Sequence, residues 1–418
     1  MHQIKYLAAA LAMLALLLSG CGGEEAARTS PAPEPTQTVE PTPTPPPEPI
    51  VATLAVCGDA MSHMPQTNDA YDSASGGYDY STSLQYVAPW VSAADYAVCN
   101  LETTLSGGPD YSGYPTFNSP DALAYDLREA GFDLVSTANN HSMDKRFEGL
   151  CRTLDVLDEA GLAHVGSYRT QEERDAGSGI VVADVGGISV AFLAYTYGTN
   201  GIPVREENSF SLNLFNTDYT TTMSTLDTEL LEADMAEARS LGTDLIAVMI
   251  HWGVEYQTTE NSYQNQVADF LFAQGADLIL GGHPHVLQPM ELRELEDGRT
   301  GFVCYSLGNF ISGQKDEYTD TTVVLNLELT KDQVTGETQI TDVTYVPMMM
   351  LNRGADADPR FLLLDARKGI AEYEAGEGGY VTEQVYQRLQ KAVGDCASIL
   401  GEQWRLTPEQ EGETDALR

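Results

Sequence analysis

From residue 51 onward, the pattern of apolar and polar residues predicts short strands that alternate with helices. Several apolar segments are uninterrupted runs, which is typical of strands that are covered on both faces. The predicted strands are Val51–Cys57, Tyr96–Cys99, Phe132–Thr137, Ile188–Ala194, Leu245–Ile250, Leu278–Leu280 and Phe302–Tyr305. The predicted helices, each followed by a glycine, are about Pro120–Ala130, Phe147–Ala160, Ser224–Ser240 and Tyr263–Gln274.

The pattern changes in the last quarter of the chain. Thr321–Leu329 and Gln339–Val346 alternate Thr and Val with polar residues, which favours antiparallel strands. A last helix is predicted at about Thr382–Leu400, after the glycine-rich stretch Ala375–Gly379. The predicted fold class is therefore α/β with α+β character and a mixed sheet.

The first twenty residues resemble an export signal. Lys5 supplies a positive charge, and the apolar run from Leu7 to Leu18 is too short to span ~30 Å of hydrocarbon as a helix. Leu18-Ser19-Gly20-Cys21 follows and resembles a bacterial lipobox. We therefore expect residues 1–20 to be a lipoprotein signal peptide, and Cys21 to anchor an extracytoplasmic protein to the cell membrane through lipid. The alternative is an ordinary signal peptide with an incidental cysteine.

Residues 21–50 are predicted to be a tether. Nine of the twenty residues from Pro31 to Ile50 are proline, and such a stretch forms a semi-rigid spacer rather than a core. We expect one large domain over residues 51–368 and a helical extension over residues 369–418.

Charge and cysteine usage narrow the possible partners. The formal net charge of −40, from 62 acidic and 22 basic residues, argues against nucleic acid and against direct adhesion to anionic lipid. The five cysteines after Cys21 include no C-x-x-C pair, so we expect free thiols. A bound metal is the obvious source of local positive charge.

Polar motifs follow five of the predicted strands. In order they are Gly58-Asp59 with His63, Asn100-Leu101-Glu102, Asn139-Asn140-His141 with Asp144, His251-Trp252-Gly253-Val254-Glu255, and Gly281-Gly282-His283-Pro284-His285. Five of the seven histidines lie in these loops. Each histidine alone could be a surface or core residue, but ligands of open α/β sheets bind at the edge where such loops meet. The convergence therefore favours a metal site.

The residue types indicate which metals the site would take. Imidazole with carboxylate and carboxamide oxygen suits Zn, Mn or Fe, and thiolate ligands are missing from the motifs. The donors are too many for one closed site and suit two ions with a bridging carboxylate. A pair of ions ~3.5–4 Å apart can activate water for an in-line displacement.

The order of these motifs, ending in Tyr-Ser-Leu-Gly-Asn-Phe at 305–310, resembles the bacterial CapA-type, poly-γ-glutamate capsule-synthesis family. That family is a branch of the calcineurin-like metallophosphoesterase superfamily. The resemblance runs from about Leu54 to Phe310 and beyond. It implies a four-layer fold in which two mixed β-sheets are packed between helices.

The resemblance also implies a role for each motif residue. One metal would take Asp59, His63 and His285, the other Asn140, His251 and His283, and Glu102 would bridge them. His141 would protonate the leaving group or steady the transition state, with Asp144 orienting it. Glu255 would be a second-shell partner and Asn309 a substrate contact. The chain departs from the superfamily in bridging with Glu102 instead of Asp, and in the wider spacing from Asp59 to His63.

Two functions remain open from the sequence. The first is a surface-anchored hydrolase that cleaves a phosphoester or an amide in capsule or other cell-envelope polymer metabolism. The second is a non-catalytic component of poly-γ-glutamate assembly or export, in which the metals hold the fold. Asn140-His141 and the His-Pro-His set favour the first, since a scaffold does not require His141. The family resemblance makes capsule-polymer synthesis or export proteins candidate partners. A solute-binding lipoprotein would not explain the clustered histidines.

Overall fold

The computed structural model describes residues 45–177 and 179–406. The predicted signal peptide, Cys21 and most of the predicted tether lie outside the described residues, as do residues 407–418. Residues 45–49 are exposed and irregular, and the first strand begins at Ile50. Within the described ranges, no helix is both long and apolar enough to cross a membrane.

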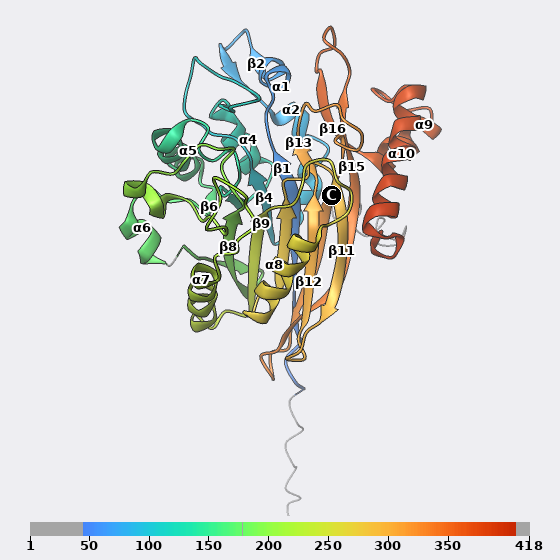
Figure 1. Cartoon of the computed structure of the whole chain (residues 1–418). Coiled ribbons are helices and arrows are strands. Elements are labelled where there is room, and N and C mark those ends of the chain that lie inside the picture. The colour runs from blue at the N-terminus through green and yellow to red at the C-terminus, as the bar shows by residue number, and fades with distance from the viewer. Residues whose placement is uncertain (1–44, 178, 407–418) are drawn as a thin grey trace, which may run out of the picture. The chain divides into compact units, whose positions relative to one another are not determined.

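Two mixed sheets form the centre of the fold (Figure 1). The first has the order β16-β15-β14-β1-β4-β5-β6, and β13 also pairs with β1. Its strands are β1 (Ile50–Ala60), β4 (Tyr96–Leu101), β5 (Leu134–Ser136), β6 (Ala163–Val165), β13 (Asn309–Ile311), β14 (Thr321–Lys331), β15 (Thr338–Asn352) and β16 (Phe361–Asp365).

The second sheet has the order β11-β12-β10-β9-β8-β7. Its strands are β7 (Val181–Val185), β8 (Ile188–Thr196), β9 (Leu245–His251), β10 (Leu278–Gly282), β11 (Leu287–Glu294) and β12 (Thr300–Leu307). Strands β8, β9, β10 and β12 are parallel, and β7 and β11 are antiparallel at the two edges.

Alternation along the strands shows how the layers stack. In β8, Phe192 packs into the large core with residues of the first sheet, whereas Leu193 packs into a separate cluster with two helices. These helices, α7 (Thr228–Ser240) and α8 (Ser262–Ala273), contribute Leu231 and Leu271 to that cluster. Since successive side chains point to opposite faces, the second sheet is covered by the first sheet on one face and by helices on the other.

One pair of helices covers the outer face of the first sheet, and another pair packs on its opposite face, beside strand β11 of the second sheet. The helices α4 (Ala122–Glu129) and α5 (Arg146–Ala160) connect the parallel strands β4, β5 and β6. The helices α9 (Ala366–Glu374) and α10 (Glu383–Leu400) pack on β15 and β16 (Figure 1). The four-layer arrangement with two mixed sheets between helices is therefore confirmed.

Most predicted elements are confirmed, with shifted ends. The helix α7 begins at Thr228 rather than at Ser224, because the side chain of Asp227 accepts the N–H of Leu230 and caps it there. The apolar pattern did not predict β6, β7, β11, β13, β16 or α9. The five described cysteines are free, as expected.

The remaining elements are short. They are α1 (Met64–Asp69), β2 (Tyr71–Asp72), β3 (Gly77–Tyr78), α2 (Ser81–Leu84), α3 (Ala88–Ser92), α6 (Gln171–Ala176), and the 3-10 turns η1 (Glu206–Ser211) and η2 (Glu402–Trp404).

Candidate metal centre

The predicted polar motifs meet where the carboxyl ends of both sheets' parallel strands come together. Asp59 lies near the end of β1, and Glu102 directly follows β4. His251 is the last residue of β9, and His283 directly follows β10. All four are buried.

Asp59 is positioned by close backbone approach. A Cβ on Gly58 would lie 1.9 Å from the carbonyl oxygen of Gly308, so only glycine lets β1 pass this close. The N–H of Asp59 then donates to that carbonyl at 2.9 Å. The carboxylate of Asp59 accepts from Asn100 Nδ2 at 2.8 Å and from the backbone N–H of His283 at 3.0 Å.

Glu102 is the most unusual carboxylate of the site. It is fully buried, and neither of its oxygens has a hydrogen-bond partner. Its Oε1 lies 3.4 Å from His251 Nε2 and 3.9 Å from His141 Nε2. Burial raises the pKa of Glu102 to about 8, and burial together with the charge of Glu102 raises the pKa of Asp59 to about 7. A nearby cation would reverse both effects.

The donor atoms fall into overlapping sets. Within each of three groups, ligand atoms lie within 4.8 Å of one another: Glu102, His251 and His283; Asp59, Glu102 and His285; Glu255, His283 and His285. The first two groups share Glu102, which is the position predicted to bridge. Asn140 Oδ1 lies 3.0 Å from His251 Nε2, so Asn140 adjoins the first group.

The histidines of these groups are in the state that binds metal. Burial lowers the pKa of His251 to about 4 and that of His285 to about 3, and it also lowers the pKa of His283. The imidazoles are therefore neutral at pH 7, with a lone pair available. His283 Nδ1 is buried without a hydrogen-bond partner. The backbone at His283 and His285 has positive φ, 98° and 61°.

His63 stands apart from the three groups. It is half-buried at the start of α1, and its Nδ1 lies 3.3 Å from the carbonyl oxygen of Met61 and 3.2 Å from the backbone nitrogen of Gly313. Its ring meets that of Phe117 edge-on, with centroids 5.1 Å apart. With Nδ1–H donating to the carbonyl of Met61, Nε2 would carry the lone pair for a metal, and the role of His63 as a ligand stays a prediction.

His141 and Asp144 form a buried pair. His141 Nδ1 lies 2.7 Å from Asp144 Oδ2, and that oxygen also accepts the N–H of Phe117 at 2.5 Å. Burial disfavours the charged imidazole, but the hydrogen bond to Asp144 and the charge of Glu102 outweigh it and raise the pKa of His141. This environment suits an imidazole that holds a proton.

Glu255 and Asn309, predicted as a second-shell partner and a substrate contact, lie at the edge of the candidate metal centre. Glu255 is exposed, and its carboxylate lies in the group with His283 and His285, which also makes it a candidate ligand. Asn309 is buried, and its Oδ1 lies 3.1 Å from His285 Nδ1. Asn309 Nδ2 donates to Gln314 Oε1 at 2.8 Å. Asn309 thus orients His285, and its predicted contact with substrate stays a prediction.

Two residues after β8 were missed by the sequence analysis. Asn200 Nδ2 lies 3.4 Å from His141 Nε2, and Asn200 Oδ1 accepts from Asn140 Nδ2 at 3.2 Å. The ring of Tyr197 lies 4.6 Å from that of His283. Both residues lie in a polar loop that directly follows a strand, as the predicted motifs do. Residues 197–205 contain no histidine or acid, however, so this loop was not recognised as part of the site.

Comparison with known proteins agrees with the motif order. Residues 53–314 match the model of the family described as bacterial capsule synthesis protein PGA_cap. The capsule biosynthesis protein CapA of Bacillus anthracis is 29% identical over 273 residues, which is 63% of this chain and 60% of that protein. The PGA biosynthesis protein CapA of Bacillus subtilis is 29% identical over 264 residues, 62% of this chain and 64% of that protein.

These alignments thus span less than two thirds of the length of either relative. Among solved structures, the calcineurin-like phosphoesterase YfkN from Bacillus subtilis aligns with a TM-score of 0.40 at 14% identity, covering 72% of this chain and 91% of that chain. The family match extends over most of the fold, from β1 to the loop after β13. The resemblance found in the motifs is confirmed, and the chain belongs to the bacterial capsule synthesis protein PGA_cap family.

Proposed function

We propose that this chain is a metal-dependent hydrolase that cleaves a phosphoester or an amide of a cell-envelope polymer. One observation carries the proposal: Glu102 is fully buried beside histidines and a second carboxylate, yet its oxygens have no hydrogen-bond partner. Ionising a carboxyl buried in this way is costly unless a cation lies beside it, and its raised pKa reflects that cost. Bound cations would remove this cost, so the donor set fits a metal centre.

The donor groups divide between two ions. Asp59, His285 and Glu102 would hold one, with His63 as a further predicted ligand. His251, His283 and Glu102 would hold the other, together with Asn140. Imidazole nitrogens mixed with carboxylate and amide oxygens suit Mn, Fe or Zn. When bound, such a pair of ions activates a water and stabilises the oxygens of the reacting bond.

His141 would protonate the leaving group, and the residues around it would position its imidazole. Asp144 holds Nδ1 of His141, so Nε2 is the atom that faces the centre, 3.9 Å from Glu102. Because its pKa is raised, His141 keeps a proton that it can donate to the leaving oxygen or nitrogen. Asn200 contacts the same Nε2 and would help to place the imidazole.

The substrate and the location are proposed from the relatives and the N-terminus. The names of the two Bacillus relatives concern capsule and PGA biosynthesis, which favours poly-γ-glutamate or a related surface polymer. Capsule-polymer synthesis or export proteins would be the partners. A lipid on Cys21 would hold the protein at the outer side of the membrane. A Cys21→Ala variant that still enters the membrane fraction and still takes up labelled fatty acid would exclude this anchor.

The test compares three histidine variants, each analysed for metal and for hydrolysis. Aryl phosphomonoesters, phosphodiesters and γ-glutamyl amides serve as substrates with Mn²⁺ or Zn²⁺. We expect about two ions per parent chain. His251→Ala should lose metal and activity together, whereas His141→Ala should keep metal and lose ~10²–10⁴ in rate. His164→Ala is the matched control, since His164 lies on β6 and contacts Asp158 instead.

Two results would contradict parts of the proposed function. Activity that survives His141→Ala on every substrate would exclude the proton-donor role. Full metal occupancy without activity on any substrate would favour the non-catalytic assembly component.

A further inference from the structure

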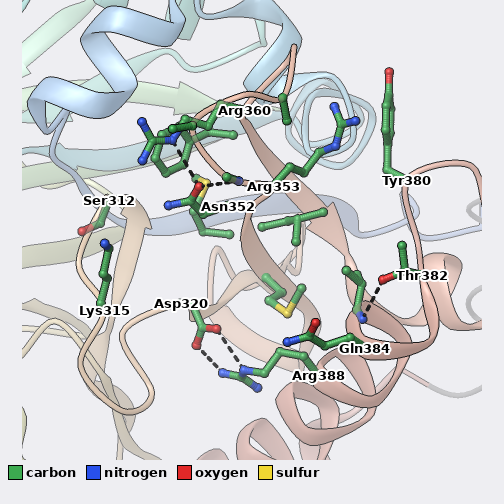
Figure 2. A pocket seen from close by; sticks show the side chains of 18 of the residues that line it. Ser312, Lys315, Asp320, Asn352, Arg353, Arg360, Tyr380, Thr382, Gln384 and Arg388 are labelled. Carbon is green, nitrogen blue, oxygen red and sulfur yellow. Dashed lines mark hydrogen bonds and ion pairs between the residues drawn. The ribbon is translucent and has the colours of Figure 1, made fainter.

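A second pocket lies beside the candidate metal centre. It is a pocket of about 930 Å³ lined by three segments, residues 312–320 after β13, residues 349–361 from β15 into β16, and residues 379–388 at the start of α10 (Figure 2). Pockets of this size commonly hold organic ligands.

The pocket gathers positive charge in a strongly acidic chain. Four basic residues and two acidic residues line it, whereas the whole chain carries −40. Arg388 is held by the carboxylate of Asp320. The side-chain cations of Lys315, Arg353 and Arg360 form no ion pair within the described residues, although the carboxylate of Asp69 accepts the backbone N–H of Arg360. These three cations are therefore available to an anionic ligand.

Two of the guanidinium groups are already held in place. Arg353 lies over the ring of Tyr380, 4.3 Å from its centroid, and donates to the carbonyl of Pro359 at 2.6 Å. Arg360 Nε donates to Asn352 Oδ1 at 3.2 Å. Each hydrogen bond uses one of the five N–H groups of an arginine, so others can pair with carboxylates. Little side-chain entropy would be lost on binding.

The cations surround the pocket and do not converge on one point. In the view of Figure 2, Lys315 lies on the side opposite Tyr380, and Arg360 and Arg388 lie at opposite ends. A single phosphate would be held best by converging donors. Cations spread around a cavity instead match a ligand with several anionic groups along its length. Leu351 and Phe361 add apolar lining, which suits the methylene groups between such charges.

One loop separates this pocket from the metal centre. Gln314 lines the pocket, accepts from Asn309 Nδ2 and donates from Nε2 to the hydroxyl of Tyr256 at 3.3 Å. The backbone nitrogen of Gly313, the preceding residue, lies 3.2 Å from His63 Nδ1. A linear ligand that extends beyond the pocket can therefore cross this loop toward the metal ligands.

We propose that the pocket binds a linear polycarboxylate, a chain with one carboxylate on each of several consecutive units. Bound there, the chain presents a bond further along its length to the metal centre. This last step rests on the proposed hydrolase function, whereas the binding does not.

The test measures binding of a fluorescein-labelled γ-glutamyl oligomer to the full chain by anisotropy, at low salt. Lys315→Gln, Arg353→Gln and Arg360→Gln should each weaken binding roughly tenfold, because each removes a charged hydrogen-bond donor. Lys315 is exposed and its replacement leaves the core untouched. Arg239→Gln is the control. It removes one charge at the exposed end of α7 and should leave binding unchanged. The helix α7 leads into the start of β9, whereas His251 lies at the other end of that strand.

Three outcomes would overturn the proposal. In the first, the double variant Arg353→Gln/Arg360→Gln binds the oligomer as tightly as the parent chain does. In the second, Arg239→Gln weakens binding as much as the pocket variants do. In the third, inorganic polyphosphate binds the pocket and the γ-glutamyl oligomer does not. Repeating the titration with His141→Ala separates the two proposals, because binding without hydrolysis supports the pocket whatever the outcome for catalysis.

Discussion

Replacing Asp144 with Asn isolates the charge that faces His141. The Asp144 carboxylate bonds His141 Nδ1 at 2.7 Å and the Phe117 N–H at 2.5 Å, and both side chains of the pair are buried. Asn keeps the size of the side chain and can still accept from Phe117. A hydrogen bond to a charged group is worth about 1.5–3 kcal/mol, against about 0.5–1.5 kcal/mol for a neutral one. The protonated imidazole should therefore lose about 1–1.5 kcal/mol, which corresponds to roughly tenfold in rate.

The assay is kcat/KM on an aryl phosphodiester with Mn²⁺, accompanied by elemental analysis of each variant. We expect Asp144→Asn to be roughly tenfold slower with unchanged metal content, and less impaired than His141→Ala. Asp158→Asn is the control, because Asp158 lies 3.2 Å from a histidine outside the centre, His164. An unchanged rate, or a loss of metal along with the rate, would refute the reasoning.

Chelation should lower the melting temperature, because the neighbouring carboxylates of Asp59 and Glu102 then lack a counter-charge. Ions at 100 times their Kd stabilise the fold by about 2.7 kcal/mol. Calorimetry that shows no change in melting temperature on chelation would contradict this prediction. Gly282→Ala should weaken metal binding roughly tenfold in titration calorimetry, since the new Cβ would lie 2.5 Å from Asp59 Oδ1. Gly394→Ala, where nothing lies within 4 Å, should not. Thr382→Ala should cost about 1 kcal/mol in urea unfolding, because Thr382 caps α10; an unchanged midpoint would show that the cap contributes nothing.

The position of the site could be predicted from the sequence because of how parallel strands are arranged. An apolar run that ends in a polar motif places that motif at the carboxyl edge of a sheet, whatever the detailed packing. Glu102 and His251 were found in this way, and the structure brings them within 3.4 Å. Asn200, which contacts His141, also follows a strand end, but its loop has no histidine or acid beside it to mark it as part of a metal site.

The fold was predictable where the apolar pattern was long. The strand β6 has three residues, too few to show a period. The strand β15 extends past its predicted end at Val346 through Pro347, a residue that usually argues against a strand. Pairing with β16 begins only at Met348, so β15 is an edge at the proline and needs no N–H on that side.

The backbone of the His-Pro-His loop constrains how this chain can change over time. His283 and His285 both have positive φ, where Asn, Asp and His are tolerated better than other side chains and β-branched residues fit poorly. Glycine fits this backbone as well but offers no ligand atom, so mutations that keep a metal-binding side chain are steered toward Asn or Asp. Each would replace a ring nitrogen with an oxygen, and oxygen-rich sites favour Mn or Mg over Zn. The shape of one loop thus sets the direction in which the metal preference of descendants can drift.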